Sequence, residues 1–179
     1  LKTFMRPVKN FIRNMDHSHH TTHLVYPGMN VIHAQWSDPE KLKGTVPPAF
    51  ARHALACFNK RMKWFMFDVH YATYFLSPEH HRDNVWTDAA VIGGTKKIIS
   101  FFAEAKEVTA AHNEMESLKA CTDEALFPTD PDVAIKNPKT WWKIHGAQWP
   151  TLQPIALRLF SIGTSTSPSE RNFSAFGHI

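Results

Sequence analysis

The feature that most constrains the fold is an apolar stripe that follows Pro47-Pro48. Its members recur at alternating steps of four and three residues, the spacing that brings side chains to one face of an α-helix. The pattern ends near Pro78, where a proline stops a helix or a short helical pair. The stripe consists of Ala51, Leu55, Phe58, Met62, Phe65 and Val69.

Helical signals of the same kind occur on both sides of this segment. We expect a helix over about residues 4–15, and a second over residues 22–36 that is interrupted at Pro27-Gly28. A long helix is predicted over residues 87–118, with Thr87 as its N-cap. The apolar stripe of that long helix is Ile98, Phe102, Ala105 and Val108.

Two short helices are predicted near the C-terminus. Asn137 is a candidate N-cap, Pro138 fits the first helical position, and Gly146 is the stop signal. The next helix begins at Pro150 and places Leu152, Ile155, Ala156 and Leu159 on one face. No segment alternates as a β-strand does, and no internal repeat is found. The predicted fold class is therefore mainly α.

Residues 123–136 are rich in Asp and Pro, a composition typical of a connector between lobes. We therefore expect three parts: a helical region over residues 1–122, a linker over 123–136, and a C-terminal region over 137–179.

Composition favours a folded chain. Of the 179 residues, 43% are hydrophobic and 12% aromatic, which excludes a disordered protein. The net charge is +4, but the basic residues are scattered, and the densest groups are Lys60-Arg61-Met62-Lys63 and Lys96-Lys97. A solvated surface is the first interpretation, and binding of a polyanion such as DNA is the second.

Cysteine use and hydropathy restrict the cellular compartment that the sequence predicts. Cys57 and Cys121 lie far apart and belong to no CxxC pair, so we expect buried free thiols in a reducing compartment. No apolar run approaches the length of a membrane span, and no secretion signal opens the chain, so no membrane partner is expected. The cytoplasm and the nucleus remain.

The histidines give weak metal signals. His17, His19, His20 and His23 lie within seven residues, but their spacing fits no closed zinc pattern, and a polar loop is the favoured interpretation. Whether this cluster binds a metal stays open. His80-His81 receives the same interpretation, and His70 is expected to be a core histidine.

Adjacent Trp141 and Trp142 allow two interpretations. Paired tryptophans can stack on bases in a single-strand binding groove, but on a short amphipathic helix they more often anchor that helix to a core. We predict core packing.

The last segment of the sequence, residues 164–179, has the pattern of a helix N-terminus. Ser167 and Glu170 match a capping box, in which each side chain bonds to a backbone amide of the first turn, and Pro168 stands at the first helical position. Phe173 and Phe176 follow at helical spacing and are expected to face a core.

Residues 141–179 resemble the C-terminal region of hAT-superfamily transposases. The family pattern is a Trp pair, a Pro-x-Leu, a Leu-Ala helix, a Ser-rich loop and Ser-Glu-Arg-x-Phe-Ser. The chain matches it with Trp141-Trp142, Pro150-Thr151-Leu152, Ile155-Ala156-Leu157, residues 164–167 and residues 169–174. The motif positions are Trp141, Trp142, Leu152, Ala156, Leu159, Ser169, Arg171, Phe173 and Ser174.

The resemblance implies a fold for the family and assigns the two helical regions of this chain to parts of that fold. Such enzymes have a ribonuclease-H-like core interrupted by a helical insertion and followed by a dimerisation region. By resemblance, residues 1–122 are insertion-type helices and residues 137–179 are a truncated dimerisation region, with the core strands absent.

The resemblance also implies a catalytic role for Glu170 in a complete enzyme. It would be the third of three carboxylates that hold divalent ions, Mg²⁺ or Mn²⁺, for phosphoryl transfer. The two aspartate partners of the family are absent here, so no cofactor is expected in this chain and Glu170 acts as a cap.

We therefore expect a fragment or domesticated remnant of a hAT-like DNA transposase that acts as a dimerisation module, homodimeric or larger, in the nucleus, without nuclease activity of its own. One alternative is a piece of a competent metal-dependent transposase whose aspartates lie upstream. The other is a non-catalytic DNA-binding helical module.

Overall fold

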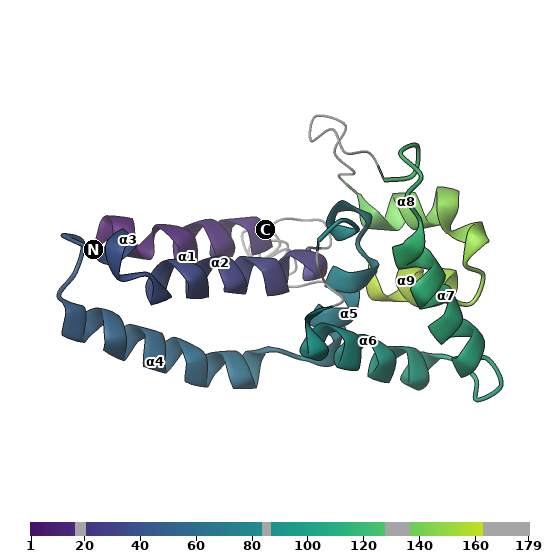
Figure 1. Cartoon of the computed structure of the whole chain (residues 1–179), viewed down its shortest axis with the longest axis horizontal. Coiled ribbons are helices and arrows are strands. Elements are labelled where there is room, and N and C mark those ends of the chain that lie inside the picture. Colours follow the sequence, from purple (N-terminus) through teal and green to yellow (C-terminus); the bar gives the residue numbers. More distant parts are fainter. Residues whose placement is uncertain (17–20, 84–86, 128–136, 163–179) are drawn as a thin grey trace, which may run out of the picture. The chain divides into compact units, whose positions relative to one another are not determined.

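The computed structural model describes residues 1–16, 21–83, 87–127 and 137–162 (Figure 1). Over these ranges the ordered elements are helices, and none of the described residues lies in a strand. The mainly helical fold class is confirmed to this extent. The described chain divides into two compact units, Leu1–Phe67 (unit 1) and Asp68–Ile162 (unit 2).

Unit 1 is built around α2. Helix α1 (Lys2–Met15) packs on α2 (Val25–Ser37), which also packs on α4 (Pro48–Phe65) (Figure 1). The 3-10 turn η1 (Thr22–Leu24) leads into α2, and the short α3 (Pro39–Leu42) follows it. The core of unit 1 centres on Phe4 and Trp36, whose rings stack with centroids 4.4 Å apart.

Two local features shape the connection from α2 to α4. The Asp38 carboxylate caps α3 by accepting from the backbone N–H of Glu40 at 3.0 Å. Gly44 has a φ of +72°, a left-handed conformation that a residue without Cβ adopts at little cost. The chain can therefore reverse direction between α3 and α4.

The predicted break at Pro27-Gly28 is wrong, because both residues lie inside α2. Pro27 falls in the first turn, where its missing N–H has no helical acceptor to lose. A Cβ at Gly28 would lie 2.5 Å from the Phe11 ring, so the glycine is what lets α1 approach α2.

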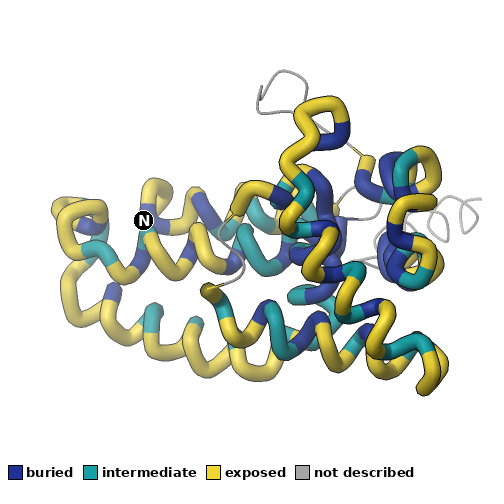
Figure 2. Tube along the Cα trace, turned by 45° about the vertical axis from the view of Figure 1, so that its right-hand side comes forward, coloured by how far each residue is buried: buried dark blue, intermediate teal, exposed yellow. Residues whose placement is uncertain are grey.

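The predicted helical pair before Pro78 is confirmed as α4 and α5 (Asp68–Leu76). Of the stripe on α4, Ala51 is buried, Leu55, Phe58 and Met62 are half-buried, and Phe65 is exposed. Unit 1 thus carries long exposed stretches along its helices (Figure 2).

Unit 2 comprises α5, η2 (Pro78–His80), α6 (Ala89–Phe102), α7 (Val108–Ala120), α8 (Pro138–His145), η5 (Gly146–Gln148) and α9 (Leu152–Leu159). The single helix expected over residues 87–118 is wrong. Ala103 adopts an extended conformation that ends α6, and a turn separates α6 from α7. The chain can then fold back, so that both helices pack on α9.

The start of α6 also differs from expectation. Asp88, not Thr87, is the N-cap, and its carboxylate accepts from the N–H of Ala90 at 2.9 Å. A carboxylate in this place also complements the positive end of the helix dipole. The buried residues of α6 are Val91, Gly94, Thr95 and Ile99. Ile98 and Phe102 of the predicted stripe are half-buried on the same face, whereas Ala105 and Val108 lie beyond the end of α6.

The division between the units lies at Phe67–Asp68, whereas the sequence suggested a linker at residues 123–136. Leu126 and Phe127, at the start of that stretch, are buried in unit 2. Residues 123–125 are exposed and residues 128–136 lie outside the described ranges, so the linker stays a prediction.

The adjacent glycines of α6 give a matched test of packing. A Cβ at Gly94 would lie 2.9 Å from Tyr71 Cδ2 and 3.0 Å from Tyr71 Cβ, whereas at Gly93 it would meet nothing within 4 Å. We expect Gly94→Ala to lower the free energy of unfolding by about 1–3 kcal/mol, because α6 must move away from α5. Chemical denaturation followed by circular dichroism measures this change.

Gly93→Ala is the control for that measurement. It should raise the free energy of unfolding by about 0.5–1 kcal/mol, since alanine favours a helix interior and no clash opposes it. Equal effects of the two substitutions would show that Gly94 has no packing role.

Candidate functional site

The Trp pair lies at the centre of unit 2. Helix α8 starts at Asn137, whose side chain accepts from the N–H of Thr140 at 3.0 Å, with Pro138 at the first position. Trp141 is 6% exposed and Trp142 is 0% exposed. The prediction of core packing is therefore confirmed, and neither ring is available to stack on a base.

Both indole groups are hydrogen-bonded to backbone carbonyls. Trp142 Nε1 donates to the carbonyl of Leu76 at 2.8 Å, and Trp141 Nε1 donates to that of Leu126 at 3.0 Å. Buried indole N–H groups need such acceptors. The bonds tie α8 to the end of α5 and to the segment after α7.

Three further aromatic residues complete this cluster. Trp149 stacks on Trp141 with centroids 6.1 Å apart, and Phe127 lies 5.0 Å from Trp141. Phe127 in turn stacks on His81 at 3.5 Å. We call His81, Phe127, Trp141, Trp142 and Trp149 the aromatic cluster.

His81 was expected in a polar loop, and that expectation is wrong. The ring is buried, and its Nε2 lies 2.7 Å from the carbonyl oxygen of Cys121, to which it can donate only when protonated on that nitrogen. Burial lowers the pKa of His81 to about 4; the bond to Cys121 opposes this shift, and the nearby charges of Lys119 and Arg82 reinforce it. His81 is therefore a neutral core residue at neutral pH.

Lys119 fixes the η2 turn to the end of α7. Its ammonium donates to the carbonyls of His80 at 3.4 Å and His81 at 3.3 Å, and lies 4.9 Å from the centroid of the Phe75 ring. Burial lowers the pKa of Lys119 to about 8, although the charge of Asp83 opposes that shift. Nothing in the local sequence pattern distinguishes this lysine from a surface one.

Glu114 of α7 caps α9, a contact that sequence reasoning missed. Its carboxylate accepts from the N–H of Thr151 at 2.9 Å and of Leu152 at 2.8 Å. The first amides of a helix lack intrahelical acceptors, and a carboxylate there also meets the positive end of the dipole. Helix α9 therefore begins at Leu152 rather than at Pro150.

The predicted motif residues fall into two groups. Trp141, Trp142, Leu152, Ala156 and Leu159 are all buried inside unit 2, where they form its core. Glu170 and the motif positions Ser169, Arg171, Phe173 and Ser174 lie outside the described residues, as does the capping box at Ser167.

The remaining predictions concern metals, thiols and membranes. His23 is buried rather than part of a polar loop, and His17, His19 and His20 are outside the described ranges. Cys57 is exposed, contrary to expectation, and Cys121 is half-buried. Among the described residues, no three His, Cys, Asp or Glu side chains are grouped to hold a metal ion, and no helix has the length and apolarity needed to cross a membrane.

The charges are divided unequally between the units. Residues 1–67 contain ten Lys and Arg against three Asp and Glu, and all ten basic residues are exposed. Residues 68–162 contain nine basic and twelve acidic residues. The basic residues themselves are spread over both units, but the net positive charge is confined to residues 1–67, where few acidic residues balance them.

Among its described residues, unit 2 carries three large exposed apolar side chains, of which Ile162 at the end of the unit is the least exposed, at 40%. Ile144 of α8 is 66% exposed, and Phe101 of α6 is 78% exposed. Single exposed apolar residues are common, so their meaning depends on the segment that carries them.

The buried His81 should make stability depend on pH. An unfolded histidine binds a proton below about pH 6.5, whereas the folded His81 binds one only near its pKa of about 4. The contribution of His81 to the free energy of unfolding is fully present above pH 6.5. It falls by up to about 3 kcal/mol as the pH falls toward 4. Urea unfolding between pH 4 and 7 measures it.

In the same experiment His81→Gln should reduce the change of the unfolding free energy with pH. A smaller pH dependence should remain from His70, because burial lowers its pKa too. His53→Gln, at an exposed position of α4, should leave the curve unchanged. A wild-type stability that does not change over this range would contradict the neutral buried state of His81.

Comparison with known proteins identifies the segment that holds most of the aromatic cluster. Residues 121–179 match the model of the hAT family C-terminal dimerisation region, which confirms the resemblance. No curated protein and no solved structure matches the chain. The matched third of the chain starts at Cys121 and includes α8, η5 and α9. Residues 121–179 are therefore similar to the C-terminal dimerisation region of the hAT family.

Proposed function

We propose that the chain is a self-association module derived from a hAT-type DNA transposase. The observation that carries the proposal is the match of residues 121–179 to the dimerisation region of that family. The module forms homodimers or larger assemblies. It derives from an enzyme with a ribonuclease-H-like core. It works in the nucleus, where the DNA on which a transposase acts is found.

We assign the proposed contact between copies to exposed residues of the matched region. Trp141, Trp142, Leu152, Ala156 and Leu159 are buried within one copy, so they support the surface and do not reach a partner. Ile144 projects from α8 within the matched region and is largely exposed. When a second copy covers this exposed apolar side chain, its removal from water lowers the free energy of association.

Sedimentation equilibrium over a concentration series tests this proposal. We expect a reversible dimer whose dissociation constant rises about tenfold in Ile144→Asp, because a carboxylate would be buried at the contact. Phe173→Asp should weaken the same dimer through the tail motif.

Phe101→Asp is the matched control, since Phe101 is at least as exposed as Ile144 but lies outside the matched region. It should leave the dissociation constant unchanged. A monomer at every concentration, or an equal loss in both variants, would contradict the proposal.

We also propose that the isolated chain does not cleave DNA, as expected of a remnant or fragment. The described residues offer no group of ligands for Mg²⁺ or Mn²⁺, and we derive no step through a metal. Metal-dependent nicking of plasmid DNA by the purified chain, lost in Glu170→Ala, would instead favour the competent-transposase alternative.

A second candidate function is DNA binding by unit 1, favoured by its excess of basic residues. On α1 the side chains of Lys2, Arg6, Lys9 and Arg13 recur at steps of four, three and four and are all exposed. They form one cationic stripe about 16 Å long. None of the four has an ion pair among the described residues, so all can neutralise phosphates.

This candidate predicts binding that weakens steeply with salt. Replacing Arg6, Lys9 and Arg13 by Gln should reduce the slope of log K against log salt by about 2–3, since each lost phosphate contact removes about 0.9. Fluorescence anisotropy with a labelled duplex measures the slope.

The control replaces three exposed lysines of unit 2, Lys96, Lys97 and Lys143, by Gln. It removes the same net charge but should change the slope little. Equal effects of the two triple variants would show that only net charge matters and would contradict the stripe.

A further inference from the structure

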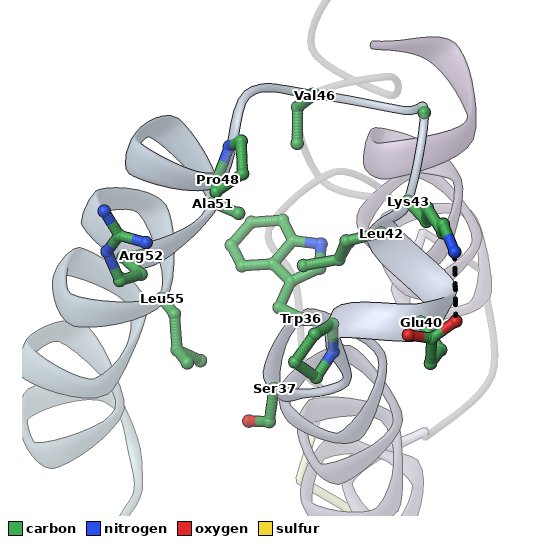
Figure 3. A pocket seen from close by; sticks show the side chains of 12 residues that line it. Trp36, Ser37, Glu40, Leu42, Lys43, Val46, Pro48, Ala51, Arg52 and Leu55 are labelled. Carbon is green, nitrogen blue, oxygen red and sulfur yellow. Dashed lines mark ion pairs between the residues drawn. The ribbon is translucent and has the colours of Figure 1, made fainter.

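Unit 1 contains a cavity of about 530 Å³ between the end of α2, the α3 turn and the start of α4 (Figure 3). Its wall is mainly apolar, and its size falls within the range of small-molecule sites. The apolar side chains of the wall are Trp36, Pro39, Leu42, Val46, Pro48, Ala51 and Leu55.

The wall is held in place without a ligand. The Trp36 ring is fixed by the stack with Phe4 and by a 3.0 Å hydrogen bond from Nε1 to the Phe4 carbonyl. Thr45 bonds through both its N–H and its hydroxyl to the carbonyl of Leu42, which sets the loop after Gly44. A preformed site loses less entropy on binding than one that must be ordered.

The polar residues at the rim leave a positive charge unbalanced. Lys43 has Glu40 as its partner at 3.9 Å, and Figure 3 shows this pair on the α3 side of the cavity. Arg52 is on the α4 side, is exposed, and forms no ion pair or hydrogen bond with any described residue. A guanidinium is a strong donor to a carboxylate.

From this arrangement we propose that the cavity binds a small amphiphilic carboxylate. The apolar body of the ligand lies against Trp36, Ala51 and Leu55, and its carboxylate accepts from Arg52. The apolar wall supplies most of the affinity, and Arg52 selects an anion over a neutral molecule of the same length. The site is separate from the matched dimerisation region.

The test uses sodium decanoate as the probe and 1-decanol as its neutral counterpart. Calorimetry at low ionic strength measures both affinities, and methyl NMR of Leu42, Val46 and Leu55 locates the site. We expect decanoate to shift these methyl signals and to bind more tightly than decanol. In Arg52→Gln the affinity for decanoate should fall about three- to fivefold, as for an exposed ion pair, while that for decanol stays the same.

Lys60→Gln is the control, because it removes an equally exposed charge from α4 away from the cavity. It should leave both affinities unchanged, and the melting temperature of each variant reports whether it folds.

Three outcomes would overturn the proposal. The first is decanoate binding without shifts of the three methyl groups. The second is a loss of affinity in Lys60→Gln equal to that in Arg52→Gln. The third is an acidic, leucine-containing peptide that shifts the methyl signals when decanoate does not, which would assign the cavity to a protein partner.

Discussion

The hydrogen bond from Trp142 Nε1 to the carbonyl of Leu76 is the contact on which the fold of unit 2 depends. It joins residues 66 positions apart and fixes α8 against the end of α5. Around it, Trp149 stacks on Trp141 and Phe127 stacks on His81, so a single buried cluster draws residues from both ends of the unit. A fully buried indole gives up a large apolar area and requires its acceptor, which makes this contact costly to lose.

How well the sequence predicted the structure depended on the range of the interactions. Local signals worked: Asn137 caps α8, Pro138 follows it, and the stripe after Pro48 forms a helix. The long helix over residues 87–118 failed because the stop at Ala103 has no proline or glycine to mark it. The cap of α6 was assigned to Thr87 rather than Asp88 because both residues are good N-caps, and the sequence alone cannot decide between two adjacent candidates.

Predictions about chemistry failed where a side chain meets a distant partner. His81 has the composition of a polar loop around it, yet its acceptor is Cys121, 40 residues away. Glu114 and Lys119 look like solvated residues of α7, but one caps α9 and the other holds the η2 turn. The resemblance of the tail, in contrast, needed only an ordered set of residue types, and the family match confirms it.

The cap that Glu114 provides has a consequence for how this region can be inherited. The matched segment begins at Cys121, seven residues after the carboxylate that holds the first amides of α9, and far beyond the carbonyl that receives Trp142. A recombination event that moved only the matched segment to another gene would leave both acceptors behind. The portable block, in evolutionary terms, is therefore α5 to α9 together, and sequence similarity marks only its second half.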